Sequence, residues 1–284
     1  MFFLDNKLFS IIIAFLPDPD KISLLMTNTK AYDNRHSVQL TQSYTYSVIK
    51  NHWSYPQIKK LIFDYNIEIK EQLLPKNLTH LTFFDSFNKM ILYPLPQTLT
   101  HLTFGRDFNQ IITSKIMNNV QVLKFGKKFN QPLFYLPNNH MREITYCIPF
   151  QTRKLIFGEE FNQPLASMRT KNHEIVLALH NNIEKIIFGR HFKYPIKNLL
   201  PINLTHLTIS LSAKEVQTEL PSGIFLTNTY AKDMKFMIEE FKKFPTSDHK
   251  GNGGFKILTD GYFDFYDGIG EQGEFLNMGL LRAR

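Results

Sequence analysis

Cysteine is almost absent from this 284-residue chain, which contains Cys147 and no other cysteine. A single thiol can form neither an intramolecular disulfide nor a cysteine-based metal cluster. This cysteine usage is typical of a reducing compartment. We therefore expect an intracellular, cytoplasmic protein in which Cys147 is a small buried side chain.

Long hydrophobic runs are absent as well. The apolar stretch from Leu8 to Leu16 is much shorter than the roughly 18 uninterrupted apolar residues of a membrane-spanning helix. No cationic segment precedes this stretch and no small-residue cleavage site follows it, as a signal peptide would require. The sequence thus predicts a soluble chain that makes no membrane contact.

The sequence also lacks the short motifs of common catalytic sites. It contains no G-x-x-x-x-G-K-S/T, no G-x-G-x-x-G after a strand, no H-E-x-x-H and no G-x-S-x-G. These absences predict a protein that is not an enzyme and has no catalytic residue, cofactor or metal ion.

Acidic residues are fewer than basic ones, with 25 Asp and Glu against 33 Lys and Arg, so the formal net charge is +8. The excess is scattered along the chain. Tracking the phosphates of a nucleic acid requires lysine and arginine clustered along one stripe. A nucleic-acid-binding repeat protein is therefore only the third function class that we consider.

The chain instead contains a short repeat. The segments N-L-T-H-L-T-F-F-D-S-F-N at 77–88, T-L-T-H-L-T-F-G-R-D-F-N at 98–109 and N-V-Q-V-L-K-F-G-K-K-F-N at 119–130 are its clearest copies. An apolar residue closes each apolar triplet, at Phe63, Phe83, Phe104, Phe125, Phe157, Phe188 and Ile209. These positions are separated by 20, 21, 21, 32, 31 and 21 residues. We interpret the two long steps as a normal rung plus a shortened one, near Tyr146 and Leu177.

The first half of each unit predicts a strand. In the pattern L-x-x-L-x-F, apolar residues alternate with polar ones as in a half-buried strand. Such strands are expected to stack about 4.8 Å apart, so that each covers the apolar face of the next. The predicted fold is a leucine-rich-repeat-like solenoid of stacked parallel β-strands with few helices.

The second half of each unit predicts a turn and an internal ladder. Gly105, Gly126, Gly158 and Gly189 follow the strand, where a turn often needs positive φ. The Phe that follows is expected to form a stacked aromatic spine, and the next Asn to bond the backbone of adjacent rungs. The predicted structural positions are Phe83, Phe87, Asn88, Phe104, Phe108, Asn109, Phe125, Phe129, Asn130, Phe157, Phe161, Asn162, Phe188 and Phe192.

The copies F-N-Q-P-L at 129–133 and 161–165, together with L-T-H-L-T-F-G at 99–105, resemble the FNIP repeat. This short relative of the leucine-rich repeat is common in amoebae and large DNA viruses. The resemblance covers roughly residues 58–209 and implies a protein-binding solenoid, located in the host cytoplasm if the source is viral. Phe192-Lys193 lacks the Asn and no F-N follows Ile209, as expected of atypical terminal repeats.

The N-terminal segment has a helical pattern that ends at Pro17-Asp18-Pro19-Asp20, and a second helical run follows at 21–30. This arrangement resembles an F-box, which binds a Skp1-like adaptor of a cullin ubiquitin ligase. The resemblance implies adaptor-binding residues at Leu4, Leu8, Ile12, Leu16 and Leu24. Asp5 departs from the motif because proline usually occupies that place. The alternative is that these helices only cap the solenoid.

A candidate binding surface follows from the strand alternation. His80, His101 and His206 lie three residues before the anchors of their units, and Lys154 and Lys185 lie at the same place in intervening units. Side chains two residues apart share a face of a strand. We therefore expect a polar concave face for a protein target, formed by His80, Thr82, His101, Thr103, Lys124, Lys154, Lys185, His206 and Thr208. A metal site is disfavoured because His206 is far from the other two histidines. The alternative is that these residues are ordinary solvated strand positions that bind no ligand.

Four segments summarise the expected organisation: an F-box-like segment and linker at 1–50, the solenoid at 51–209, a capping segment with a helix at 210–244 and a glycine-rich irregular tail at 245–284. We expect a linking helix at 43–53 and a helix beginning near Asn228. The sequence favours a monomeric substrate-recognition subunit of a Skp1–cullin-type ubiquitin ligase. The second alternative is a repeat scaffold or decoy that has no link to ubiquitin.

Overall fold

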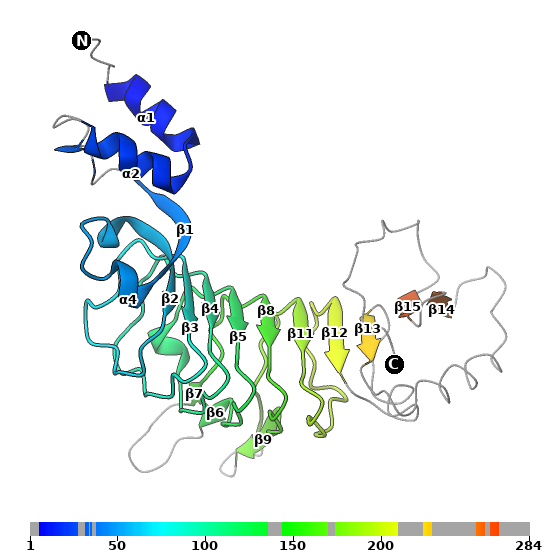
Figure 1. Ribbon diagram of the computed structural model, residues 1–284. Helices are drawn as coiled ribbons and strands as arrows, with labels where there is room; N and C mark the ends of the chain where they lie inside the picture. Colours follow the sequence, from blue (N-terminus) through cyan, green and yellow to red (C-terminus); the bar gives the residue numbers. More distant parts are fainter. Residues whose placement is uncertain are drawn as a thin grey trace.

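The computed structural model describes residues 6–27, 32–33, 35, 38–135, 144–169, 174–209, 224–228, 254–258 and 262–266. Its main element is a parallel sheet of nine strands in the order β1-β2-β3-β4-β5-β8-β11-β12-β13, in which each rung of the coil adds one strand (Figure 1). These strands are β1 (Leu40–Thr45), β2 (Ile58–Phe63), β3 (His80–Phe83), β4 (His101–Thr103), β5 (Val122–Lys124), β8 (Lys154–Ile156), β11 (Lys185–Ile187), β12 (His206–Ile209) and β13 (Phe225–Asn228). The structure thus confirms the leucine-rich-repeat-like solenoid.

Few helices accompany the sheet. Those whose bounds lie within the described residues are α1 (Asn6–Phe15), α2 (Asp18–Met26), the single turn α4 (Tyr46–Ile49) and two 3-10 turns, η2 (Tyr55–Gln57) and η3 (Ser114–Ile116). None of the helices in the described part of the chain is long and apolar enough to cross a membrane.

The core is a stack of phenylalanine rings. Within a rung the two rings lie 3.8 to 4.1 Å apart, as for Phe125 and Phe129 or Phe104 and Phe108. Between rungs the anchor rings from Phe83 to Phe188 are 5.3 to 5.8 Å apart and nearly parallel, whereas Phe63 packs edge-on against Phe83 at 5.8 Å and 75°. The distances between rungs fall in the range that favours aromatic pairs. The predicted aromatic spine is confirmed and has two parallel columns.

The asparagine ladder is also confirmed. The backbone N–H groups of Asn88, Asn109, Asn130, Asn162 and Lys193 each donate to the Oδ1 atom of the asparagine one rung earlier, at 2.9 to 3.1 Å. Lys193 donates such a bond to Asn162 but has no Oδ1 of its own, so the ladder ends there. The sequence analysis missed two components. Asn66 begins the ladder, and Gln110, Gln131 and Gln163 donate a second bond to the same Oδ1 atoms.

The predicted reason for the turn glycines was wrong. None of the four has a positive φ. A Cβ at Gly126 would instead collide with the backbone carbonyl of Gly105, and one at Gly158 would collide with that of Gly126. Glycine is required because successive turns stack backbone against backbone.

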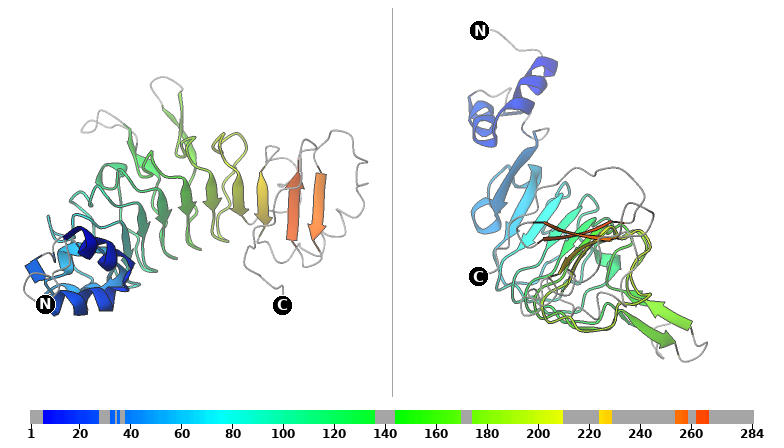
Figure 2. Two further views of the ribbon diagram at one scale, coloured as in Figure 1. Left: turned by 90° about the horizontal axis from the view of Figure 1, so that it is seen from above. Right: turned by 90° about the vertical axis from the view of Figure 1, so that its right-hand side faces the viewer.

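The two long repeat steps do not contain shortened rungs, and that interpretation was wrong. Tyr146 lies in β7 (Thr145–Tyr146), which pairs antiparallel with β6 (Phe134–Tyr135). Leu177 lies in β10 (Glu174–Leu177), which pairs antiparallel with β9 (Ala166–Arg169). Both hairpins project from the side of the coil opposite the parallel sheet (Figure 2). The sheet itself passes directly from β5 to β8 and from β8 to β11.

The expectations for the flanking segments need correction. Residues 43–53 contain the end of β1 and the single turn α4 rather than a linking helix, so the sheet begins at Leu40. Asn228 ends strand β13, whereas residues 229–244 lie outside the described residues. In the tail, β14 (Gly254–Leu258) pairs antiparallel with β15 (Tyr262–Tyr266), so this part is not irregular.

Tyrosines cover the N-terminal end of the aromatic spine. Tyr46 from α4 lies 4.7 Å from Phe63, the first anchor ring. Tyr55 and Tyr65 pack edge-on against Tyr46 at 5.9 and 5.5 Å. These rings close the core at its first rung. Ile13 of α1 and Leu25 of α2 are buried in the same apolar cluster, so both helices also contribute to this end of the core.

Candidate binding face

The register of the parallel strands aligns two columns of side chains on the side of the sheet away from the core. We call them together the inner face. The first column contains Lys60, His80, His101, Val122, Lys154, Lys185 and His206. The second contains Ile62, Thr82, Thr103, Lys124, Ile156, Ile187 and Thr208. All nine residues that the sequence proposed for this surface lie in these columns.

The inner face is less polar than the sequence analysis expected. Val122, Ile156 and Ile187 are half-buried members of the columns and separate the polar positions. Lys60, which the sequence analysis also missed, precedes His80 in the first column. All four could have been identified from the number of residues that separate each from the anchor of its own unit, because this number sets the register in the sheet. The face therefore combines cationic and aliphatic side chains.

Each histidine of this face is held by the threonine that precedes it. The Thr79 hydroxyl donates to the Lys59 carbonyl at 3.1 Å and lies 2.9 Å from Nδ1 of His80. A hydroxyl has one proton, so Nδ1 of His80 must be the donor to Thr79 Oγ1. The Thr-His pairs at 100–101 and 205–206 repeat this geometry. The motif L-T-H-L-T thus fixes the tautomer and orientation of each ring.

His80 and His101 stack face to face, with ring centroids 4.0 Å apart and an interplanar angle of 9°. Burial lowers the pKa of both rings, and neighbouring charges lower it further: His101 and Lys60 for His80, and Lys154 and Lys60 for His101. Parallel rings direct their Nε2 atoms side by side rather than toward one point, so the pair does not form a chelating site. Among the described residues no cluster of three potential metal ligands occurs.

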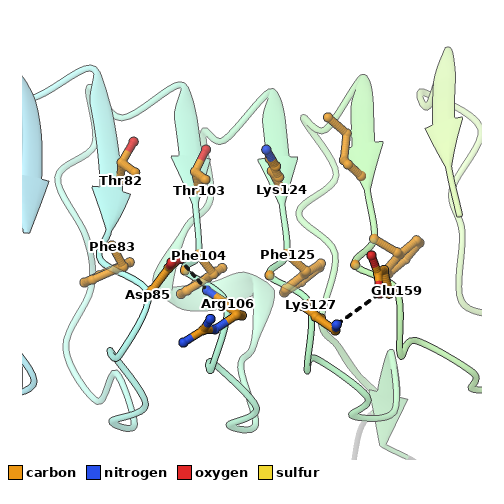
Figure 3. A pocket seen from close by; sticks show the side chains of 15 residues that line it. Thr82, Phe83, Asp85, Thr103, Phe104, Arg106, Lys124, Phe125, Lys127 and Glu159 are labelled. Atoms are coloured by element: carbon orange, nitrogen blue, oxygen red, sulfur yellow. Dashed lines mark hydrogen bonds and ion pairs between the residues drawn. The ribbon is translucent and has the colours of Figure 1, made fainter. Parts of the chain in front are cut away.

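A shallow groove of about 380 Å³ crosses the carboxyl ends of β3, β4, β5 and β8 (Figure 3). Thr103, Lys124 and Ile156 border it on the strands. Arg106, Lys127 and Glu159 border it in the turns. The Lys127 ammonium lies 3.2 Å from the Glu159 carboxylate, and this hydrogen bond lowers the pKa of Glu159. On the turn side of the groove, Lys127 and Glu159 are thus ion-paired, and the Asp85 carboxylate accepts a hydrogen bond from the Arg106 backbone N–H at 3.1 Å.

The N-terminal helices present apolar side chains to solvent. Ile11, Ile12, Phe15 and Met26 are exposed, Phe15 by 85%. Of the predicted adaptor-binding residues, Ile12 is exposed, and Leu16 and Leu24 are half-buried. Leu4 and the side chain of Leu8 lie outside the described residues. Among the side chains of α1 that the structure describes, at residues 11–15, Ile13 is the buried one and lies one position beyond the predicted stripe; the sequence analysis also missed Phe15.

A buried carboxylate attaches these helices to the first strand. Asp18 is 1% exposed and begins α2. Its oxygens accept hydrogen bonds from the Gln42 backbone N–H at 2.7 Å, the Tyr44 hydroxyl at 3.1 Å and the Lys21 ammonium at 3.2 Å. Burial alone would raise the pKa of Asp18, but these donors outweigh burial and lower it. The Pro-Asp-Pro segment is therefore a polar anchor to β1 as well as a turn.

Two stretches of the chain, residues 65–107 and 172–212, match the family model of the FNIP repeat. Together they span well under half of the chain, and residues 119–165, which include two F-N-Q-P-L copies, lie outside them. None of the curated proteins matches this chain significantly.

A similar solved structure is described in the words "The crystal structure of CroV588 a novel circular LRR protein structure". It is 27% identical, with a TM-score of 0.47, and the alignment covers 68% of this chain and 33% of that one. The chain thus spans about a third of the length of that structure. The repeat match and the parallel coil together describe a repeat protein.

Proposed function

We propose that this repeat solenoid is a non-enzymatic substrate-recognition subunit of a Skp1–cullin-type ubiquitin ligase. In this proposal the inner face holds a protein target, while α1 and α2 bind a Skp1-like adaptor. Solenoids commonly bind partners along the extended surface of their stacked repeats. The role involves no chemistry by the chain itself.

The exposed apolar side chains of α1 and α2 carry the adaptor part of this proposal. Both helices lie beyond β1 and extend away from the coil (Figures 1 and 2). The residues by which α1 and α2 join the core, Ile13 and Leu25, are buried, so capping does not explain why the exposed Ile12 and Phe15 are apolar. Exposed apolar groups that lie close together favour a protein interface.

Co-purification tests the adaptor interaction. We expect wild-type chain, co-expressed with a Skp1-like adaptor and a cullin, to retain both, and the Ile12→Glu/Phe15→Glu variant to lose both because it places charge in an apolar interface. The matched control is Ile111→Glu, which changes another exposed apolar residue far from the helices. Equal retention by all three proteins would contradict the adaptor role.

The alternative proposal is a scaffold or decoy that binds protein targets without a ubiquitin ligase. It shares the inner face with the first proposal and differs in what α1 and α2 bind. The same experiment separates the two. If the wild-type chain retains neither adaptor nor cullin, the scaffold role is favoured.

A further inference from the structure

Three lysines of the inner face differ from charged groups around them in having no ion pair. Lys60, Lys124 and Lys154 make no ion pair with any residue that the structure describes, whereas Glu159 and Glu184 beside the face are ion-paired. The Asp85 carboxylate, which lines the groove, accepts a hydrogen bond from the Arg106 backbone N–H at 3.1 Å. Glu159 pairs with Lys127 and Arg190, and Glu184 pairs with Arg153 at 2.8 Å. The two columns themselves contain no Asp or Glu.

From this arrangement we infer that the inner face binds an acidic, extended segment of a protein target. The inference rests on the proposed role of this face in target binding. The carboxylates of the segment lie against Lys124 and Lys154, and its apolar side chains lie against Ile156 and Ile187. Complementary charge of this kind confers specificity and speeds association.

The shape of the face supports a linear segment laid across the strands. The groove is shallow and crosses four successive rungs, so it can hold a chain but does not enclose a small molecule. Strands β5 and β8 are neighbours in the sheet, and Lys124 pairs with Ile156, so Lys154 lies diagonal to Lys124, one strand across and two residues back along the strand. Acidic residues close together in one peptide can reach both.

The composition of the face favours a polypeptide over a nucleic acid. A nucleic acid is bound through a continuous basic stripe that follows its phosphates. Here Val122 interrupts the first column between His101 and Lys154, and Ile156 and Ile187 follow Lys124 in the second. Neither column contains arginine. Alternating cationic and aliphatic positions fit a segment in which acidic and apolar residues alternate.

Fluorescence polarisation with the full chain tests the inference. The probe is a fluorescein-labelled peptide of repeating Asp-Leu-Glu-Ser, and its control replaces Asp and Glu by Asn and Gln. We expect the acidic probe to bind and the amide control not to bind. The Lys124→Glu/Lys154→Glu variant is expected to weaken binding roughly ten-fold or more, because both charges oppose the ligand.

The matched variant Lys89→Glu/Lys115→Glu carries the same change in net charge on exposed positions outside the inner face. We expect it to bind the acidic probe as wild type does. Equal weakening by both double variants would overturn the inference, because attraction would then depend on net charge alone. Tighter binding of labelled oligo-dT than of the acidic peptide, with the same dependence on Lys124 and Lys154, would overturn it in favour of a nucleic acid.

This outcome is separate from that of the adaptor experiment. A chain that retains adaptor and cullin but does not bind the acidic peptide would disprove only the inference about the target. A chain that binds the peptide but retains no adaptor would disprove only the ubiquitin-ligase role.

Discussion

Single residues of the repeat are constrained mainly by the rung that precedes them. Each turn glycine faces the carbonyl of the previous turn, each asparagine accepts the N–H of the next rung, and each phenylalanine stacks on its counterpart. The columns of the inner face obey the same rule, since each threonine that orients a histidine also donates to the carbonyl of the rung before. One residue therefore serves two rungs.

The close contact between Gly126 and the Gly105 carbonyl predicts that a larger residue at position 126 lowers stability. Gly126→Ala is expected to lower the free energy of unfolding by about 1–3 kcal/mol, because the added methyl group meets the Gly105 carbonyl and the backbone must shift. Lys127→Ala, at the next, exposed position, is the control and should have little effect. Urea denaturation of both variants measures the difference, and an unchanged midpoint for Gly126→Ala would show that the turns are not closely stacked.

The stacked histidines predict a dependence of stability on pH. His80 and His101 have a lowered pKa in the folded chain, so the unfolded chain binds more protons as pH falls below about 6.5, the ordinary histidine value. Stability should therefore be fully present above that pH and decrease as pH falls through the lowered values. Lys60 and Lys154 add positive charge close to the pair, which further disfavours protonation of the rings in the folded chain.

Denaturation midpoints at pH 7.5 and 5.0 test this prediction. The His80→Gln/His101→Gln variant is expected to lose a smaller part of its stability between the two conditions than wild type. Thr103→Gln, which changes the same face without removing a titrating group, should lose as much as wild type. If the histidine variant and wild type lose the same amount, protonation of the stacked pair does not control stability.

At the scale of the elements, the parallel strands of the repeat could be predicted from the sequence, whereas the two antiparallel hairpins and strand β1 could not. The anchors Phe83 to Phe188 gave the correct strands and columns, because the same spacing from each anchor produces the same register. Tyr146 and Leu177 gave false rungs because they are apolar and lie 21 and 20 residues after an anchor. Their pairing with β6 and β9 is antiparallel and depends on neighbours that periodicity does not encode.

Strand β1 was missed for a related reason. Its sequence L-T-Q-S-Y-T lacks the apolar alternation of the repeat, and only Leu40 is buried. A strand at the end of a sheet is stabilised by pairing on one side, here with β2, and by the side chains that reach it from α2. The Asp18 anchor was missed as well, since no local pattern marks a carboxylate whose donors lie 24 and 26 residues later.

The Asp18 anchor predicts a local rather than a global effect. Asp18→Ala leaves the buried Lys21 ammonium unpaired, which typically costs about 3–5 kcal/mol. We expect α1 and α2 to detach from β1 while the aromatic core remains folded. Hydrogen exchange should accelerate at the Gln42 amide and within α2 but not in β4 or β5. Asp20→Ala, an exposed carboxylate in the same helix turn, is the control.

A second variant tests whether the effect of Asp18→Ala comes from the unpaired charge of Lys21. Asp18→Leu/Lys21→Met removes both charges together and should restore much of the protection of α2, because apolar pairs often replace buried ion pairs at no loss of stability. If Asp18→Ala accelerates exchange equally throughout the sheet, the anchor belongs to the core and the helices are not a separate module.

The molecule as a whole is a one-dimensional array in which each rung contacts its neighbours. Phe129 is fully buried between Phe108 and Phe161, at 6.2 Å from each ring. Phe129→Ala should cost about 3–5 kcal/mol locally. Because energy in such arrays is shared mainly between adjacent repeats, the effect should decrease with distance along the coil.

Hydrogen exchange measures this decay directly. We expect the amides of β4, β5 and β8 to exchange faster in Phe129→Ala than in wild type, and those of β2 and β12 to change little. The exposed substitution Lys128→Ala serves as the control. Uniform acceleration from β2 to β12 would instead mean that the solenoid unfolds as one cooperative unit.

The two hairpins leave the coil at equivalent places. Strand β6 begins directly after Leu133 and β9 directly after Leu165, in each case four residues beyond the asparagine of its F-N-Q-P-L copy. Extra sequence thus enters where a rung turns behind the sheet, and the register of His101, Lys154 and Lys185 is unaffected by it. A gene encoding this repeat can gain or lose whole insertions at that point without changing the residues of the inner face. The inner face and the inserted hairpins can thus evolve independently within one coil.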